Sequence, residues 1–176
     1  LIYVEGKGVV VREPSVVAVD KNTGKILQVG ADARNMMGRT PGNVVAMRPL
    51  KDGVISDHEM TVQMLQHLFR RAVKASVFNP KPRVVICVPS GVTEVEERTV
   101  INAAIEAGAR RVYLIEEPLA AALGANLPVE EASGHMVIDV GAGTTDIAVV
   151  SLNGVANSAS VEAAGDSFDE AIARHV

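Results

Sequence analysis

A glycine-rich loop between two β-branched segments constrains the fold of this chain more than any other feature of its sequence. Residues 136–140 read Met-Val-Ile-Asp-Val, the loop reads Gly141-Ala-Gly-Thr-Thr-Asp146, and Ile-Ala-Val-Val follows directly. Because β-branched runs on both sides predict strands, we expect the loop to join two strands in a hairpin. A dinucleotide-binding fold would need a third glycine in place of Asp146 and a helix after the loop. The sequence therefore disfavours a Rossmann site, and it contains no P-loop motif.

The residue types of this loop suit a phosphate. Glycines let a backbone approach a ligand closely, and threonine hydroxyls with consecutive N–H groups can surround a phosphate. Asp139 lies two residues before Gly141 on an apolar strand, where a carboxylate is costly unless it is paired or faces a cation. We therefore interpret Asp139 as facing Mg²⁺ and its water at a phosphate site. An ordinary glycine-rich hairpin is the alternative.

The composition excludes a nucleic-acid partner. The 176 residues carry 17 Lys and Arg against 21 Asp and Glu, which gives a formal net charge of -4. The chain therefore lacks the basic footprint that binds a phosphate backbone. Only 3% of the residues are aromatic and none is Trp, so a base-stacking surface has nothing to be built from.

The sequence shows no sign of membrane insertion or export. No apolar run approaches the about 18 residues that a membrane-spanning helix needs, and the first residues lack a secretory signal. The single cysteine, Cys87, stands in an apolar run and is predicted to be a small hydrophobe in a reducing compartment. Leu1 falls in mid-strand by its pattern and Val176 in the first turns of a helix, so we expect a fragment.

The first third of the chain predicts strands and a small irregular region. Short apolar runs alternate with turn signals over the first thirty residues, which predicts an antiparallel meander. Residues 31–55 are rich in Gly, Pro and Asn and predict a small subdomain with about one turn of helix.

Helices and strands are predicted to alternate after that region. Ser56 and Glu59 form a capping-box pair ahead of a helix expected over residues 57–75. The apolar residues that recur on one face of this helix are Val62, Leu65, Leu68, Phe69, Ala72 and Val73. An apolar run at residues 84–88 then predicts a buried strand.

A second cycle follows. Thr93 and Glu96 form another capping box, and Gly108 is expected to end that helix. Residues 112–115 predict a strand, after which Pro118 opens a short helix. Buried strands that alternate with helices predict parallel pairing in an α/β sheet.

The last part of the chain partly repeats the first. A linker-like segment at residues 128–134 precedes the hairpin, and Ser167 is expected to start a final helix. Residues 1–20 laid on residues 147–166 show five identities with turns and strands in register. The layout indicates an internal duplication, and two unrelated β-meanders are the alternative.

With its Asp-x-Gly hairpin, the chain resembles the actin superfamily, whose duplicated domains each contribute such a hairpin to grip nucleotide phosphates. Within the superfamily it is similar to the MreB family of bacterial actins. The resemblance covers essentially all 176 residues. The segments that carry it are Gly6-Lys-Gly-Val-Val-Val-Arg-Glu-Pro-Ser-Val-Val-Ala-Val19, Gly38-Arg-Thr-Pro-Gly-Asn43, Arg48-Pro-Leu-Lys-Asp-Gly-Val-Ile55, Leu114-Ile-Glu-Glu-Pro-Leu-Ala-Ala-Ala122 and Asp139-Val-Gly-Ala-Gly-Thr-Thr145.

The resemblance implies the architecture. We expect an α/β fold of the actin-like ATPase (ribonuclease H-like) class, with a mixed sheet, flanking helices and a duplicated domain whose second copy is incomplete. Residues 1–18 and 51–130 would form the first large subdomain, and residues 19–50 its small insertion. Residues 131–176 would start the second large subdomain.

The resemblance also implies two catalytic residues. Glu117, at the strand-to-helix turn before Pro118, would position the water that attacks the γ-phosphate, and Asp139 would act on Mg²⁺ through water. Its neighbour Glu116 is interpreted as an electrostatic or structural partner. Without the resemblance, simple capping of the helix start is an alternative role for Glu117.

The implied nucleotide contacts lie in two segments. The residues expected to bind the phosphates are Gly141, Ala142, Gly143, Thr144 and Thr145. Gly165 and Asp166 lie where the family closes its nucleotide cleft. The sequence departs from the family in two places here, since Ala142 stands where Gly is usual and Asp146 where Glu is usual.

Two surface contacts are implied as well. Val77 and Phe78 resemble a membrane-inserting loop, although a hydrophobic contact that closes a helix end is the alternative. Val95 and Arg98 lie in the helix between paired protofilaments. Glu97 replaces a customary Arg in that helix, which weakens the transfer.

For the intact protein the resemblance implies an ATP-binding and Mg²⁺-binding filament with slow ATP hydrolysis. It would lie in the cytoplasm, peripheral to the inner face of the cell membrane, and determine rod shape by organising cell-wall synthesis. The implied partners are further copies of itself, the inner membrane surface and cell-wall elongation proteins such as RodZ, MreC and MreD. The family's first phosphate hairpin and adenine-binding segments are missing from the sequence, so we expect this chain alone neither to bind ATP tightly nor to polymerise.

Two other classes of function stay open at this point. A chaperone-type ATPase or a sugar kinase of the same superfamily shares both the hairpin and the Glu-Pro turn. A non-catalytic interaction module is the third possibility for a chain of this length.

Overall fold

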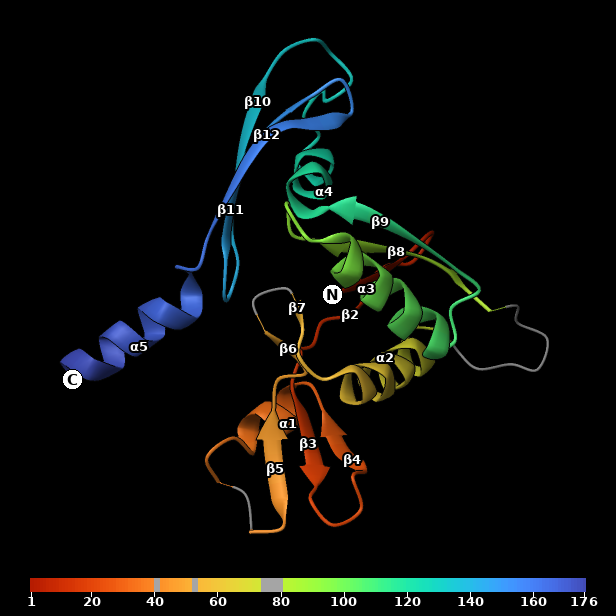
Figure 1. The fold of residues 1–176 in the computed structure, drawn as a ribbon, viewed down its shortest axis with the longest axis vertical. Helices are drawn as coiled ribbons and strands as arrows, with labels where there is room; N and C mark the ends of the chain where they lie inside the picture. The colour runs from red at the N-terminus through yellow and green to blue at the C-terminus, as the bar shows by residue number, and fades with distance from the viewer. Residues whose placement is uncertain (40–41, 52–53, 74–80) are drawn as a thin grey trace. The chain divides into compact units, whose positions relative to one another are not determined.

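The computed structural model describes residues 1–39, 42–51, 54–73 and 81–176 (Figure 1). The chain divides into two compact units. The first comprises Leu1–Lys51, Ile55–Val84 and Thr99–Val112, and the second comprises Asp52–Val54, Val85–Arg98 and Tyr113–Val176. Both contain helices and strands, so the predicted α/β class is confirmed.

The first unit contains a three-stranded antiparallel sheet. Its central strand is β3 (Val17–Asp20), which pairs with β4 (Ile26–Val29) on one side and β5 (Val44–Met47) on the other. The sequence predicted β3 and β4 but treated the region of β5 as irregular. β5 is a short run of four residues, and its partner lies more than twenty residues upstream, so the local pattern alone did not reveal it.

The predicted meander is broken at its middle. β1 (Ile2–Val4) and β2 (Gly8–Val11) form an antiparallel sheet of their own, and β2 does not continue into the sheet of β3. Pro14 lies between β2 and β3, and the Val16 N–H donates to the Pro14 carbonyl at 2.9 Å. A proline cannot donate a ladder hydrogen bond, so the chain turns here instead of extending the first sheet.

The start of α1 (Ala31–Asn35) is held from outside the helix. Gly30 at the N-cap has φ 80° and no side chain to accept from the first turn. Glu13 Oε2 accepts a hydrogen bond from the Ala31 N–H at 2.8 Å, and Glu13 Oε1 accepts one from Arg71 Nη1 at 2.8 Å. One carboxylate thus joins the start of α1 to the last turn of α2.

The N-cap of helix α2 (His58–Ala72) lies one residue later than predicted. Asp57 is the N-cap, and its Oδ1 accepts from the Met60 N–H at 3.0 Å. Ser56, the predicted cap, instead donates from its Oγ to the Pro49 carbonyl at 2.9 Å. The predicted capping box of Ser56 and Glu59 is therefore wrong, because Asp57 is an equally good cap that stands nearer to the helix.

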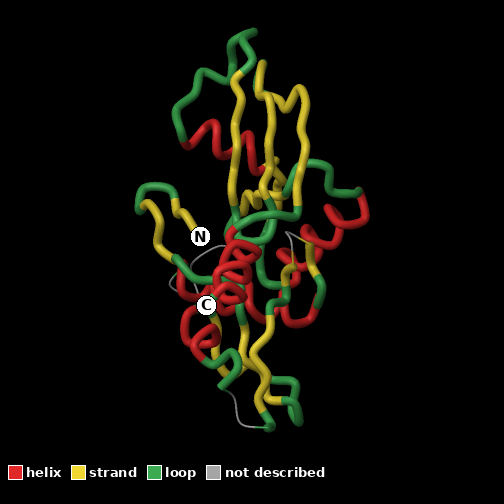
Figure 2. Tube along the Cα trace, turned by 90° about the vertical axis from the view of Figure 1, so that its left-hand side faces the viewer, coloured by secondary structure: helices red, strands yellow, loops and turns green. Residues whose placement is uncertain are grey.

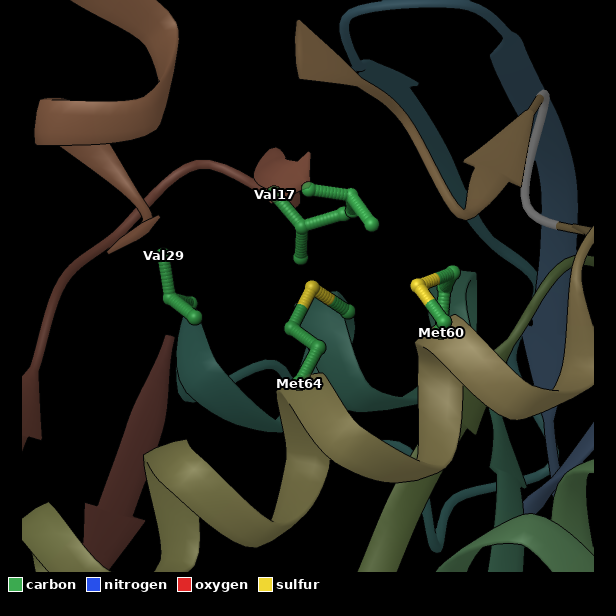
Figure 3. Close-up of a cluster of buried hydrophobic side chains, with 5 residues drawn as sticks. Val17, Val29, Met60 and Met64 are labelled. Carbon is green, nitrogen blue, oxygen red and sulfur yellow. The ribbon is translucent and has the colours of Figure 1, made fainter. Parts of the chain in front are cut away.

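Helix α2 buries two faces, of which the sequence predicted one. Val62, Leu65 and Phe69 pack with Ala103 and Ala107, as the apolar spacing indicated. The second face carries Met60 and Met64, which pack against Val17, Val19 and Val29 of the sheet (Figure 3). Met64 is 1% exposed. Methionine fills irregular gaps between elements, and here it joins the helix to the sheet.

Helix α3 (Glu94–Glu106) has the predicted ends. The Thr93 N–H donates to Glu96 Oε2 at 2.7 Å, and the Glu96 N–H donates to Thr93 Oγ1 at 3.3 Å, which is the reciprocal capping box. Gly108 follows the helix with φ 115°, as expected of a glycine that ends a helix.

Short strands connect these helices. β8 (Arg83–Val88) lies beside β9 (Arg111–Glu116), and β6 (Leu50–Lys51) lies beside β7 (Val54–Ile55). Cys87 is exposed, and so is Val85 at 63%. The prediction of a buried strand at residues 84–88 is therefore only partly correct, because alternate residues of a strand point to opposite faces and Val85 and Cys87 lie on the more exposed one.

The second unit is built on a three-stranded antiparallel sheet. Its strands, β10 (His135–Val140), β11 (Thr145–Ser151) and β12 (Gly154–Val161), run side by side (Figure 2). Helix α4 (Glu117–Gly124) packs on this sheet, where Ala122 and Val150 are fully buried together with Val129.

The segment predicted as a linker is part of this core. Val129 is 1% exposed, and its carbonyl accepts from the Asn153 N–H at 2.8 Å. The Glu131 carbonyl accepts from the Leu152 N–H at 3.2 Å. Residues 128–134 are polar and proline-bounded, so their composition concealed one buried valine and two hydrogen bonds to the β11–β12 turn.

Helix α5 (Gly165–His175) starts before its predicted cap. Ser167 lies in the first turn, where its Oγ accepts from the Ala164 N–H at 3.1 Å and donates to the Ala164 carbonyl at 2.7 Å. No residue of α5 is buried. Across the part of the chain that the structure describes, no helix is both long and apolar enough to cross a membrane.

The two segments of the suspected internal repeat have in common only an antiparallel hairpin. β1 with β2 and β11 with β12 are both antiparallel pairs joined by short turns. Beyond the hairpins the equivalent residues differ, since Asp20 ends a strand and Asp166 lies in a helix.

Candidate functional site

The glycine-rich loop is the predicted hairpin between β10 and β11. The last strand pair is Val140 with Thr145, and the Gly141 N–H donates to the Thr144 carbonyl at 2.9 Å to close the loop. A Cβ on Gly141 would lie 3.1 Å from that carbonyl oxygen, which is why a glycine stands there. Within the described residues, the N–H groups of Ala142, Gly143 and Thr144 have no acceptor. Successive free N–H groups of this kind can bind an anion.

The start of α5 is bonded to the same loop. The Gly165 N–H donates to the Gly141 carbonyl at 3.2 Å, and the Asp166 N–H donates to the Ala142 carbonyl at 2.8 Å. The structure thus brings Gly165 and Asp166, which the resemblance placed where the family closes its nucleotide cleft, to the hairpin. The loop carbonyls accept from α5, and the loop N–H groups remain available to a ligand.

Both threonine hydroxyls of the hairpin donate inside the protein. Thr144 Oγ1 donates to Asp146 Oδ2 at 3.2 Å, and Thr145 Oγ1 donates to the Ala163 carbonyl at 2.7 Å. A hydroxyl has one hydrogen to donate. Neither threonine hydroxyl therefore has a hydrogen left for a phosphate oxygen in this arrangement.

Two aspartates face each other across the hairpin. Asp139 of β10 is directly paired with Asp146 of β11, and directly opposed residues of an antiparallel pair project from the same face. Asp146 is 2% exposed, and its Oδ1 is buried without a hydrogen-bond partner. Like charges in such a pair destabilise a sheet, so this arrangement is costly unless a cation or a donor group joins it.

A third carboxylate lies at the start of α4. Strand β9 ends at Glu116 and the helix begins with Glu117 and Pro118, whose missing N–H is tolerated in a first turn. Glu116 is the N-cap but makes no capping bond with its side chain; its Oε2 accepts from Ser90 Oγ at 2.9 Å. This contact ties the residue before Glu117 to the end of β8.

The charges of both aspartates affect the pKa of Glu117. Burial raises the pKa of the Glu117 carboxyl, and the nearby carboxylates of Asp146 and then Asp139 raise it further. Partial burial also raises the pKa of the Cys87 thiol, and the Glu117 charge adds to that effect. The structure therefore gathers Glu117, Asp139 and Asp146 near the free N–H groups of the hairpin.

The sequence pointed to Glu117 and Asp139 as site residues, whereas Asp146 stood out there only as a departure from the family. The signal that could have identified it is spacing. Asp146 shares its strand face with Ala148 and Val150, which are both buried, and a carboxylate in a buried row is unusual unless it has a function.

The donor set suits a hard cation that keeps part of its water. Carboxylate oxygens are the ligands that Mg²⁺ prefers, and Mg²⁺ is usually held by one or two of them together with substrate phosphates. Over the ranges that the structure describes, no three His, Cys, Asp or Glu side chains could hold a metal ion by themselves. These carboxylates therefore suit a cation that binds together with a phosphate ligand.

The remaining predicted site residues lie elsewhere on the surface or outside the described ranges. Val95 of α3 is 73% exposed, and Arg98 Nη2 donates to Glu94 Oε2 at 3.3 Å within the same helix. Val77 and Phe78 lie outside the described residues.

A mixed α/β chain whose glycine-rich turn joins two antiparallel strands, with an aspartate on each strand, fits the actin-like ATPase class. A solved structure agrees with this class: MreB5 of Spiroplasma citri bound to ADP matches with a TM-score of 0.89 and 40% sequence identity, over 98% of this chain and 51% of that chain. The chain belongs to the MreB/Mbl family, because the profile described as MreB/Mbl protein matches residues 1–176. The resemblance seen in the sequence is thereby confirmed.

Curated relatives place the chain in the same family. It is 54% identical over 180 residues to the cell shape-determining protein MreB of Escherichia coli (strain K12), covering 100% of this chain and 52% of that protein. It is 52% identical over 176 residues to the cell shape-determining protein Mbl of Bacillus subtilis (strain 168), covering 100% of this chain and 53% of that protein. The chain spans about half the length of the curated relatives that it matches.

Proposed function

We propose that this chain supplies one side of a Mg²⁺-ATP site in a cell shape-determining, filament-forming bacterial actin. The observation that carries the proposal is the run of three N–H groups without acceptors, at Ala142, Gly143 and Thr144, beside a cluster of carboxylates. The structures of MreB5 of Spiroplasma citri bound to ADP and to AMPPNP support a nucleotide as the ligand.

In the proposed site the phosphates are bound by backbone rather than by hydroxyl groups. The N–H groups of Ala142, Gly143 and Thr144 would donate to phosphate oxygens, since the hydroxyl hydrogens of Thr144 and Thr145 are used within the protein. Such donors, held in place before the reaction, stabilise charge that develops on the transferred group.

Mg²⁺ would neutralise charge on the phosphates when it is bound. Asp139 is the residue proposed to hold it, through a water molecule. Its position opposite Asp146 and close to Glu117 concentrates negative charge where a cation would arrive.

Glu117 is the residue proposed to orient the attacking water. A carboxylate whose pKa is raised by burial and by neighbouring charge accepts a proton more readily than an ordinary glutamate. Its place at the first residue of α4, fixed by the Glu116 contact with Ser90, would hold the carboxylate toward the hairpin. In-line attack by the oriented water would then transfer the γ-phosphoryl group.

At the level of the cell, we propose a homopolymer at the cytoplasmic face of the membrane that organises cell-wall synthesis. The family match and the cell shape-determining relatives favour this role over a chaperone-type ATPase or a sugar kinase. Filament contacts would use the exposed face of α3 at Val95 and Arg98, and membrane contact would use Val77 and Phe78. RodZ, MreC and MreD are the proposed wall-synthesis partners.

A matched pair of glycine variants tests the nucleotide site in a full-length chain of the family that carries these residues. In Gly141→Ala the new Cβ would lie 3.1 Å from the Thr144 carbonyl and force the loop to shift. Each charge-assisted contact that is lost costs about 1.5 to 3 kcal/mol, so Mg²⁺-ATP affinity should fall at least tenfold in calorimetry.

The control is Gly154→Ala in the neighbouring turn, where the nearest atom would be 3.9 Å away. Its affinity should equal that of the wild type. Wild-type-like affinity of Gly141→Ala would exclude this hairpin as the phosphate site. Pelleting with ATP, measured on the same samples, tests polymerisation separately.

A further inference from the structure

Asp146 is the one charged side chain that is buried in the described part of the chain. It is 2% exposed, and it continues the row of Ala148 and Val150 on the buried face of β11. Asp139 stands directly across from it. Both the desolvation of a carboxylate and the like charge opposite it disfavour folding, so local stability gives no reason for an aspartate here.

The two oxygens of Asp146 have different surroundings. Oδ2 accepts from the Thr144 hydroxyl at 3.2 Å, while Oδ1 is buried without a partner. Because the Thr144 hydroxyl gives its only hydrogen to Asp146, its oxygen has only lone pairs left for a ligand. A phosphate oxygen also has only lone pairs to offer, so it cannot bond to Thr144 Oγ1. A water molecule can.

We propose that Asp146 is a positioning residue that keeps the Thr144 hydroxyl in use as a hydrogen-bond acceptor, so that this hydroxyl binds a water molecule while the Thr144 N–H stays available to a phosphate oxygen. The inference rests on the proposed nucleotide function and specifies how one residue serves it. The water is either the attacking molecule or a member of the hydration shell of Mg²⁺. In both cases Asp146 acts through Thr144 and touches no reacting atom itself.

Removal of the Asp146 carboxylate should raise stability and lower turnover. Asp146→Leu keeps the branched shape of the side chain and removes the charge from a buried row. We expect the melting temperature without nucleotide to rise by about 2 to 4 °C. We expect kcat for ATP hydrolysis to fall at least tenfold, with the dissociation constant of Mg²⁺-ATP within about threefold of wild type, because no phosphate contact is lost.

Three companion variants make the assignment specific. Thr144→Val should lower kcat to the same degree, and the double variant should be no slower than either single variant, because residues that act as one unit are not additive. Asp146→Glu retains a carboxylate and matches the residue usual in the family, so it should restore hydrolysis to within a few-fold of wild type.

Titration with Mg²⁺ at fixed ATP distinguishes the two sources of water. An unchanged Mg²⁺ dependence in Asp146→Leu identifies the attacking water, and a dependence weakened by about two- to threefold identifies the hydration shell. The inference is overturned if Asp146→Leu lowers the melting temperature together with kcat, if the losses of the two single variants multiply in the double variant, or if Asp146→Glu is as inactive as Asp146→Leu. Failure of the wild type to bind Mg²⁺-ATP would count against the proposed function, whereas the melting temperatures bear on Asp146 alone.

Discussion

Replacement of Glu13 by alanine should release the start of α1. Glu13 accepts two hydrogen bonds at 2.8 Å, one from the Ala31 N–H and one from Arg71 Nη1. The bond to the N–H of a first turn has no substitute, because Gly30 at the N-cap has no side chain. The Glu13 side chain is 14% exposed and that of Arg71 47% exposed.

The exposures decide how much each bond contributes. The bond that the Glu13 carboxylate accepts from the Ala31 N–H involves a charged group and contributes about 1.5 to 3 kcal/mol, whereas an ion pair with a half-exposed arginine contributes about 0.2 to 1 kcal/mol. Glu13→Ala should therefore cost about 2 to 4 kcal/mol of local stability, which corresponds to a loss of about 30-fold to 1,000-fold in protection against amide hydrogen exchange. The amides to follow are those of α1, among them the Arg34 N–H, which donates to Gly30.

The pH dependence carries a definite sign. The bond from Ala31 and then the bond from Arg71 hold the pKa of Glu13 below its ordinary value of 4.5. A lowered folded-state pKa means that the stabilisation is complete above the unfolded pKa and disappears as the pH falls through the folded one. Protection of α1 should therefore decline on acidification below about pH 4.5 in the wild type and stay level in Glu13→Gln.

Arg71→Ala serves as the control, because it removes only the ion pair and should reduce protection less than tenfold. Protection in Arg71→Ala as low as in Glu13→Ala would refute the reasoning, since the backbone bond would then contribute nothing. Unchanged exchange in Glu13→Ala would refute it as well.

The remaining predictions concern the proposed site in a full-length chain of the family. Glu117→Gln should lower kcat about 100-fold to 10,000-fold with ATP affinity within a few-fold of wild type, because a water-orienting group acts in the transition state. Glu116→Gln is the matched control and should keep its hydrolysis rate, and an equal loss in both variants would contradict the assignment. Asp139→Asn should weaken ATP binding in the presence of Mg²⁺ but not in its absence, as measured by calorimetry, and an unchanged metal requirement would remove Asp139 from the proposed metal site.

The features that the sequence predicted well are those whose causes are local. The capping box of Thr93 and Glu96, the glycine at position 108 and the β10–β11 hairpin each depend on residues a few positions apart. The position of Gly165 and Asp166 at the hairpin was not predicted, because the resemblance to the actin superfamily placed them only where the family closes its nucleotide cleft.

The features that the sequence missed depend on what packs against them. Val44 to Met47 become a strand because β3 lies beside them, and Met60 and Met64 are buried because α2 meets that sheet as well as α3. Asp57 replaced Ser56 as the cap of α2 because two neighbouring residues could both serve, and only the tertiary contact of Ser56 with Pro49 decides between them.

The same limit applies to the site. Glu117 and Asp139 were named as site residues from the resemblance and stay predictions, whereas Asp146 stands out only when one face of β11 is covered. Strand alternation groups it with Ala148 and Val150, and the sequence does not say which face of the strand will be buried.

The hydrogen bonds between α5 and the hairpin have an electrical consequence. The Gly141 carbonyl, which accepts from Gly165, belongs to the same peptide plane as the Ala142 N–H, and the Ala142 carbonyl, which accepts from Asp166, shares its plane with the Gly143 N–H. A peptide group that accepts a hydrogen bond is polarised into a stronger donor. The two polarised peptide groups thus extend the positive potential of the α5 N-terminus to the N–H groups of the loop. An anion at the hairpin would therefore be stabilised by the helix dipole without touching the helix.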